Sequence, residues 1–295
     1  MQTDKGKFAA GDGVELCFEQ TGNGSGEAII FAHEFAAEIQ TWYAQFEALQ
    51  NDYHCIAFNA RGWPPSDVPE DPGLYSQDRQ VADIIDLMDH LGLAKAHIVG
   101  LSMGSTTTLL FGIAHPDRAL SLTIASTGYG AIGGDRAVFH AETGAMADTL
   151  ETKGWGELAP DYGNGPARRP LAIKEPEAHA AFLERLAGHS GAGSARTMRT
   201  VQMVRPAFPD IADDLRAMKV PVLLIVGDDD GPAIEGTLYL KKTIPTAGLF
   251  MLPRSGHMLN LEETGAFNLV LGRFLKFASD GTWDRLIPDP DAGMF

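Results

Sequence analysis

The sequence predicts an α/β fold, with a mostly parallel sheet and helices on both of its faces. Residues 28–32 and 220–226 are short and almost wholly apolar, as expected of strands that are covered on both sides. Segments with helical spacing lie between such strands, and this alternation is typical of a parallel sheet. At 295 residues, with 44% hydrophobic and 21% charged side chains, the chain is long enough to bury a substantial core.

The first half of the chain contains most of the strands that this architecture needs. Its clearest helix is 81–91, where five apolar residues recur at helical spacing and Gly92 supplies a C-terminal stop. A Gly-Asp-Gly turn within residues 7–19 separates two strands. Further strands are expected at residues 28–32, 53–59, 96–99 and 121–125, and further helices at residues 39–50 and 103–114.

Residues 131–215 interrupt this alternation. Helical patches there are separated by Gly- and Pro-rich links, and we interpret the segment as a helical cap, or lid, inserted over the carboxyl edge of the sheet. The patches are centred on residues 137–150, 176–187 and 195–204. The alternation then resumes with strands at 220–226 and 248–252 and helices at 234–243 and 262–277, followed from residue 279 by an expected surface extension. We therefore predict a core domain of residues 1–130 and 216–295, and a cap domain of residues 131–215.

The charge balance excludes several classes of partner. With 39 acidic and 23 basic side chains, the net charge is −16, which repels phosphate backbones and anionic lipid surfaces. We therefore expect no nucleic-acid partner and no membrane partner. The first residues lack the apolar stretch of a signal peptide, and Cys17 and Cys55 are the only cysteines, so we expect a reduced, cytoplasmic protein.

The strongest local signal is a Gly-x-Ser-x-Gly motif at residues 100–104, between an apolar strand and a helix. A sharp turn between a strand and a helix holds a serine in a strained conformation and exposes its hydroxyl. The helix that follows directs the positive end of its dipole at this point, where negative charge is then favoured. The motif predicts that Ser102 is a nucleophile.

Four further segments appear in the order found in a known family. They are Ala32-His33-Glu34-Phe35, Arg61-Gly62-Trp63-Pro64-Pro65-Ser66, Gly227-Asp228-Asp229-Asp230 and Ser255-Gly256-His257. With the serine motif, they make residues 7–277 resemble the α/β-hydrolase superfamily. The chain order of serine, acid and histidine is the order of that family.

The resemblance implies a role for each of these residues. Ser102 would be the nucleophile, His257 the base and Asp230 the acid, with Asp228 and Asp229 as alternatives for the acid. The backbone N–H groups of Phe35 and Met103 would form the oxyanion hole. A further list of candidate substrate contacts contains His33, Glu34, Trp63, Tyr129 and Met258, although several of these side chains could equally serve in packing.

Glu34 departs from the family pattern, which usually has glycine after this histidine. A carboxylate beside a developing oxyanion would oppose catalysis unless it is turned away or neutralised. One hypothesis is that Glu34 turns from the pocket and pairs with Arg61, and the alternative is a solvated loop glutamate.

The function that follows from these observations is hydrolysis of a small carboxylic ester or lactone through an acyl-enzyme on Ser102. Three alternatives stay open: a carbon–carbon bond hydrolase, an acyltransferase on the same triad, and a ligand-binding protein without catalysis. Haloalkane dehalogenases and epoxide hydrolases are excluded because they use aspartate as the nucleophile. We expect a small-molecule acyl substrate, no organic cofactor and no metal, and the sequence leaves the oligomeric state open, a homodimer included.

Overall fold

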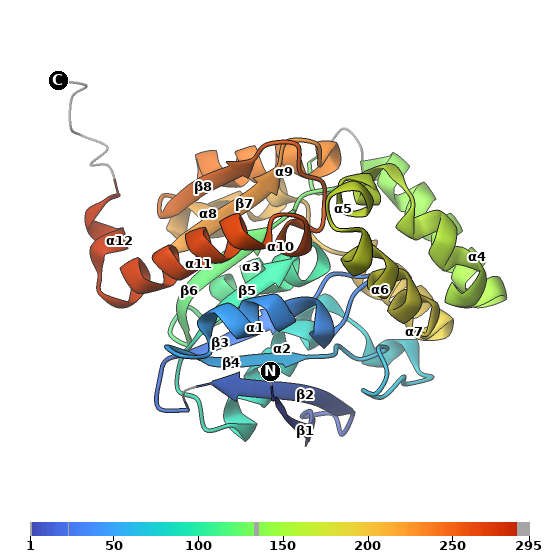
Figure 1. The fold of residues 1–295 in the computed structure, drawn as a ribbon, viewed down its shortest axis with the longest axis horizontal. Helices are drawn as coiled ribbons and strands as arrows, with labels where there is room; N and C mark the ends of the chain where they lie inside the picture. The colour runs from blue at the N-terminus through green and yellow to red at the C-terminus, as the bar shows by residue number, and fades with distance from the viewer. Residues whose placement is uncertain (1, 23, 133–135, 288–295) are drawn as a thin grey trace.

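In the described part of the chain (residues 2–22, 24–132 and 136–287), the computed structural model contains an eight-stranded sheet in the order β1-β2-β4-β3-β5-β6-β7-β8 (Figure 1). The strands are β1 (Asp4–Ala9), β2 (Glu15–Gly22), β3 (Ala28–Ala32), β4 (His54–Phe58), β5 (Ala96–Leu101), β6 (Ala119–Ala125), β7 (Val222–Gly227) and β8 (Ala247–Leu252). The pairs β1·β2 and β2·β4 are antiparallel, and the other pairs are parallel. The predicted fold class is confirmed.

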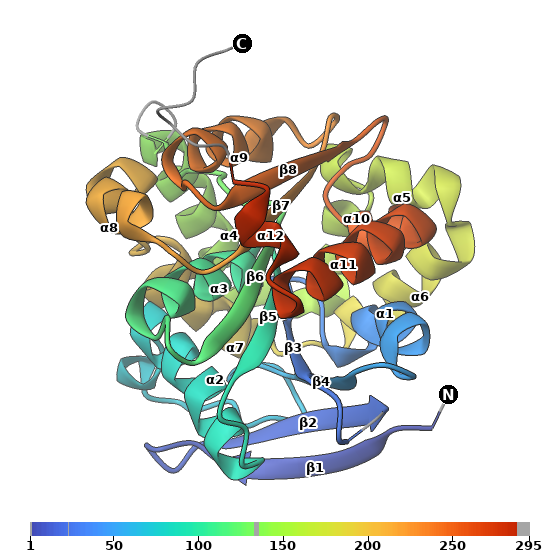
Figure 2. The same cartoon turned by 90° about the vertical axis from the view of Figure 1, so that its left-hand side faces the viewer.

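Helices cover both faces of the sheet (Figure 2). Ile84 of α2 and Leu109 of α3 belong to the apolar core on one face, and Phe46 of α1 and Phe267 of α11 belong to the core on the other. Side chains of β3 alternate between these cores, which explains why this strand is wholly apolar. The helical elements outside the segment between β6 and β7 include η1 (Ile39–Trp42), α1 (Tyr43–Leu49), η2 (Pro72–Leu74), α2 (Gln77–His90), α3 (Met103–Ala114), α9 (Gly231–Thr243), α10 (Leu259–Glu262) and α11 (Thr264–Ser279).

A helical insertion connects β6 to β7, and Figure 1 shows its helices α4 to α7 gathered beside one end of the sheet. Its elements are α4 (Arg136–Gly163), η4 (Pro166–Arg168), α5 (Arg169–Lys174), α6 (Pro176–Ala187), α7 (Gly191–Thr197), η5 (Met198–Gln202), η6 (Phe208–Ile211) and α8 (Ala212–Ala217). Its buried side chains, such as Trp155 and Phe182, share a third apolar cluster with Phe35 and Met103 from the sheet loops. The insertion therefore packs directly against the loops that follow the strands.

One predicted helix is longer than expected, and the tail contains a helix that was not predicted. The helix expected to end near residue 150 continues as α4 to Gly163, and Gly154 (φ 69°, ψ 179°) marks a kink within it. In the tail, which was expected to be a surface extension, four residues form the short helix α12 (Thr282–Arg285), none of which is buried. Trp283 packs on Phe274 with ring centroids 4.6 Å apart and donates a hydrogen bond to the Thr246 carbonyl, 2.8 Å away. The part of this tail at residues 288–295 lies outside the described residues.

Cys17 and Cys55 are both buried and form no disulfide. Within the described ranges, no helix combines the length and the apolar character needed to cross a membrane.

Candidate active site

Ser102 lies on the sharp turn between β5 and α3. Its φ of 54° and ψ of −108° place it in a region that residues other than glycine rarely adopt. A Cβ atom at Gly100 would lie 2.2 Å from the Gly104 carbonyl oxygen, and one at Gly104 would lie 2.2 Å from the Ala32 carbonyl oxygen. The two glycines of the motif are therefore required by close backbone contact.

His257 and Asp230 lie in the loops that follow β8 and β7. The imidazole Nδ1–H of His257 donates a hydrogen bond to Asp230 Oδ2, 2.8 Å away. Of the three adjacent aspartates, Asp230 is buried and faces the imidazole, whereas Asp229 is exposed and lies 3.6 Å from Arg254. This hydrogen bond selects the tautomer that leaves His257 Nε2 free to accept a proton.

The electrostatics of this pair favour its ionised form. Burial alone would lower the pKa of His257, but the charge and hydrogen bond of Asp230 outweigh burial and raise that pKa above its usual 6.5. Burial would likewise raise the pKa of Asp230, and the charge and hydrogen bond of His257 outweigh burial and lower it. The imidazolium that forms when His257 takes a proton is thus stabilised by an adjacent carboxylate.

Ser102 and His257 line one cavity of about 320 Å³. Its other walls are mainly apolar and include side chains from the insertion. These are Phe139, Met146, Tyr162 and Met198, with the polar Gln202 and Arg205 beside them. An adjoining cavity of about 360 Å³ shares Tyr129, Tyr162 and His257 with the first. The arrangement provides room for a small molecule over the serine.

The loop after β3 is held rigidly against the serine turn. Gly104 N–H donates to the His33 carbonyl at 3.2 Å, and Trp63 Nε1–H donates to the Phe35 carbonyl at 3.1 Å. His33 Nε2 accepts a hydrogen bond from the Ala60 N–H at 3.0 Å, so its proton lies on Nδ1, which donates to the Glu34 carbonyl at 2.7 Å. Burial lowers the pKa of His33 to about 4, which keeps it neutral.

This loop and the serine turn together leave two backbone donors available near the serine. Among the described residues, the hydrogen bonds of turns and loops do not use the N–H of Phe35 or of Met103. Phe35 lines the same cavity as Ser102, and Met103 directly follows Ser102 in the chain. Two such donors are what an oxyanion hole requires.

The hypothesis that Glu34 pairs with Arg61 was wrong. Glu34 Oε2 lies 2.6 Å from Nη2 of Arg168, which comes from η4 of the insertion, and both side chains are buried. The same oxygen lies 3.7 Å from His257 Nε2, so Glu34 does not turn away from the site. The Arg168 guanidinium also lies over the rings of Tyr162 and Phe182.

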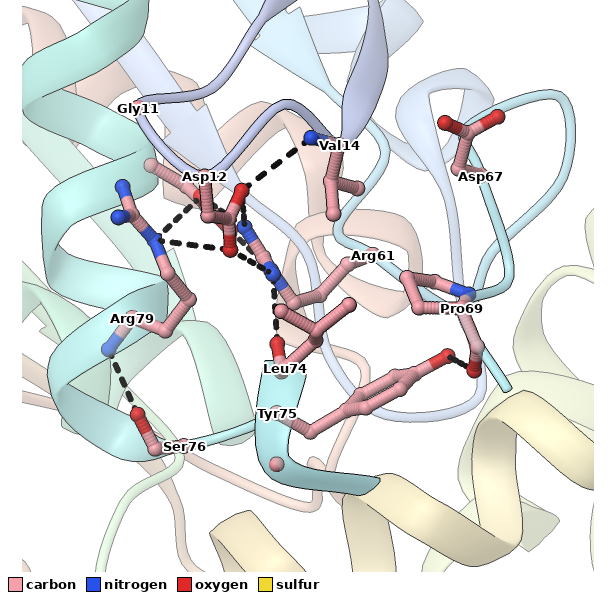
Figure 3. A network of polar contacts seen from close by, with 12 residues as sticks. Gly11, Asp12, Val14, Arg61, Asp67, Pro69, Leu74, Tyr75, Ser76 and Arg79 are labelled. Atoms are coloured by element: carbon pink, nitrogen blue, oxygen red, sulfur yellow. Dashed lines mark hydrogen bonds and ion pairs between the residues drawn. The ribbon is translucent and has the colours of Figure 1, made fainter. Parts of the chain in front are cut away.

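Arg61 is unavailable to Glu34 because two aspartates already hold it. Its Nε and Nη2 donate to the two carboxylate oxygens of Asp83 at 2.9 and 2.7 Å, and its Nη1 donates to Asp12 at 2.7 Å and to the Leu74 carbonyl at 2.5 Å. Figure 3 shows the Asp12 carboxylate between the side chains of Arg61 and Arg79. Burial would raise the pKa of Asp12, but its hydrogen bonds and the charges of both arginines outweigh burial and lower it. This arginine joins the β1–β2 turn to α2 and has a structural role.

The predicted substrate contacts are only partly brought together. Tyr129 lines both cavities, whereas Trp63 and Met258 are fully buried in the apolar cluster beneath the insertion. Arg168 and Arg205 were missed by sequence reasoning, since both lie in the insertion and no motif surrounds them. The only signal for Arg168 was that a buried Glu34 needs a cation.

Comparison with known proteins places the chain in a family. Residues 27–264 match the family model described as the alpha/beta hydrolase fold, and the chain therefore belongs to this family. The chain is 26% identical over 267 residues to 3-oxoadipate enol-lactonase 1 of Acinetobacter baylyi, covering 90% of this chain and 94% of the relative. It is 26% identical over 282 residues to a 2-hydroxy-6-oxononadienedioate/2-hydroxy-6-oxononatrienedioate hydrolase of Burkholderia vietnamiensis, covering 90% and 93%.

A solved structure agrees on the fold. The enol-lactonase from Burkholderia xenovorans LB400 superposes with a TM-score of 0.80 at 24% identity, covering 92% of this chain and all of that chain. The relatives named here are enzymes, and the chain belongs to the same enzyme class, the α/β hydrolases.

Proposed function

We propose that the protein is a serine hydrolase that cleaves a small carboxylic ester or lactone through an acyl-enzyme on Ser102. The observation that carries this proposal is the shared cavity of Ser102 and His257, with Asp230 bonded to the far side of the imidazole. The relatedness to an enol-lactonase along nearly the whole chain supports a lactone or ester as the substrate class.

The reaction would proceed in two halves. Ser102 Oγ attacks the carbonyl carbon while its proton passes to His257 Nε2, and the N–H groups of Phe35 and Met103 stabilise the oxyanion. His257 then gives that proton to the departing alcohol oxygen, which in a lactone remains attached to the acyl chain. A water molecule then attacks the acyl carbonyl carbon while His257 takes its proton. The resulting tetrahedral intermediate collapses as the bond to Ser102 Oγ breaks, His257 returns the proton to Oγ, and the acid leaves.

We also propose that residues 131–215 act as a cap that selects the substrate. Phe139, Met146 and Met198 of this segment form apolar walls of the cavity over Ser102. In this arrangement the loops of the core supply the reacting groups, and the insertion determines the size and polarity of what can reach them.

Labelling with a fluorophosphonate tests the nucleophile. The native protein should be labelled at Ser102, the Ser102→Ala variant should not be labelled, and peptide mass spectrometry should locate the adduct. Ser126 is a built-in control, because it lines the same cavity but its hydroxyl oxygen is buried, and it should stay unmodified. Absence of labelling in the folded native protein would instead favour the ligand-binding alternative.

A further inference from the structure

Three arginines in the described chain are buried, with 7% or less of their surface exposed: Arg61, Arg168 and Arg205. Arg61 has carboxylate oxygens of Asp12 and Asp83 at 2.7 Å, and Arg168 has a carboxylate oxygen of Glu34 at 2.6 Å. Among the described residues, Arg205 has no carboxylate within 4.0 Å. Within the described ranges, it is therefore the buried arginine whose charge no carboxylate compensates.

The contacts of Arg205 hold its guanidinium in place without neutralising it. Its Nη1 donates to the side-chain oxygen of Gln202 at 2.7 Å, its Nη2 donates to the Tyr129 carbonyl, and the guanidinium carbon lies 4.6 Å from the ring centre of Phe139. Its Nε is buried and finds no hydrogen-bond acceptor in the part of the chain that the structure describes. Burial and the neighbouring charge of Arg136 lower the pKa of Arg205 to about 10, so it remains a cation at neutral pH.

A buried cation without an anion is costly, because neutral acceptors do not replace the solvation that a charge loses. Such a group in a cavity is a candidate for ligand binding. Arg205 lines the cavity that contains Ser102 and His257. The one carboxylate in the wall of this cavity, among the described residues, is Glu142, which is exposed and accepts a hydrogen bond from the Tyr129 hydroxyl.

We propose that Arg205 binds a carboxylate of the substrate, so that the enzyme acts on esters or lactones that carry a second, anionic carboxyl group. The proposal rests on the proposed function for the reaction, and it adds the charge of the substrate. Arg61 shows that a buried arginine of this protein can pair with a carboxylate, since its Nε and Nη2 donate hydrogen bonds to both oxygens of Asp83. On Arg205, a substrate carboxylate would provide the counter-charge that the guanidinium lacks among the described residues.

Matched ester pairs test this substrate class. Para-acetoxybenzoate and its methyl ester differ by a charge on the leaving group, and mono-para-nitrophenyl glutarate and its methyl ester differ by a charge on the acyl group. The native enzyme should prefer the charged member of at least one pair. In that pair, Arg205→Gln should lower kcat/KM for the charged member at least about 30-fold more than for the neutral member, and Arg205→Lys should recover part of the preference.

A control variant separates local recognition from overall charge. Arg199→Gln removes the same charge from the same segment, but Arg199 pairs with Asp148 and Glu151 on the surface and does not line the cavity. It should keep the native preference. Equal losses of kcat/KM for both members of each pair in Arg205→Gln, or no preference in the native enzyme, would overturn the proposal.

A binding measurement keeps this test independent of turnover. Calorimetric titration of monomethyl glutarate and of para-hydroxybenzoate into the Ser102→Ala variant should detect binding of at least one of them, and the Ser102→Ala/Arg205→Gln variant should bind it at least about tenfold more weakly. If no ester is hydrolysed but this difference is found, the proposed function fails and the carboxylate site stands. If esters are hydrolysed and neither anion binds, the carboxylate site fails and the proposed function stands.

Discussion

Replacing Glu34 with glutamine is expected to lower the pKa of His257. The Nε2 side of this imidazole faces Glu34, which favours the imidazolium, and the charge of Arg168, which disfavours it. Glu34→Gln removes the favourable charge and leaves Arg168 without its ion-pair partner. The charge of Arg168 then acts on the imidazole without the opposing charge of Glu34, so the neutral imidazole should persist to lower pH.

The structure sets the size of this effect. Two unit charges separated by the 3.7 Å between Glu34 Oε2 and His257 Nε2 interact with about 4 kcal/mol at an effective dielectric constant of about 20. This energy is an upper bound, because the glutamine dipole retains part of the attraction and the charge of Glu34 is the smallest of the influences that set the pKa of His257. We therefore expect the pKa of His257 to fall in Glu34→Gln, so that kcat/KM measured below the native pKa rises relative to the native enzyme.

The assay is the pH dependence of kcat/KM for an activated ester, whose acid limb reports the pKa of the base in the free enzyme. Because His257 must be neutral to accept the serine proton, activity is lost as the pH falls through its pKa, and in Glu34→Gln this loss should occur at lower pH. Arg168→Gln should move the acid limb to higher pH, and the double variant should lie between the two.

These opposite signs make the reasoning refutable. An unchanged acid limb in Glu34→Gln, or one that moves to higher pH, would show that Glu34 does not act on the charge of His257. A shift of the same sign in Arg168→Gln would show that the two variants only disturb the packing of the loop. Thermal unfolding of each variant checks that the fold is retained, since breaking a buried ion pair costs about 3–5 kcal/mol.

Three further predictions concern the reaction and the fold. Asp230→Asn should lower kcat for ester hydrolysis by about 10⁴-fold, because the imidazole loses the partner that fixes its tautomer. Asp229→Asn is the control at an exposed position, and equal activity in the two variants would contradict the assignment of Asp230 as the acid. Asp83→Asn should lower the free energy of unfolding in urea by about 3–5 kcal/mol, because it removes the bidentate partner of the buried Arg61. If Asp83→Asn lowers that free energy by no more than the roughly 0.5 kcal/mol expected for Asp229→Asn, the structural role of the Arg61–Asp83 pair is contradicted. Gly104→Ala should abolish esterase activity and lower the melting temperature, because its Cβ would lie 2.2 Å from a backbone carbonyl oxygen. Native-like activity of Gly104→Ala would show that the backbone of the serine turn can move to make room for the Cβ.

Local patterns predicted much of the fold and part of the site. Residues 28–32, 103–114 and 176–187 form elements with the expected bounds, because apolar periodicity and flanking Gly or Pro residues act over a few positions. The turn at Ser102 could be anticipated for the same reason, since its strand, its glycines and its helix are adjacent in the chain. The periodicity of residues 282–285 is too short to predict a helix, and α12 depends on the contacts of Trp283 with distant residues.

The sequence by itself thus determined the strand–helix alternation and the strained serine, because both depend on neighbours in the chain. Only the tertiary structure decided which charged side chains lie around the site. Glu34 and Arg168 are 134 positions apart, and Arg205 enters the cavity from a segment with no motif. An ion pair depends on a separation of a few ångströms, and that separation is set by how the insertion packs on the sheet loops, which no local pattern records.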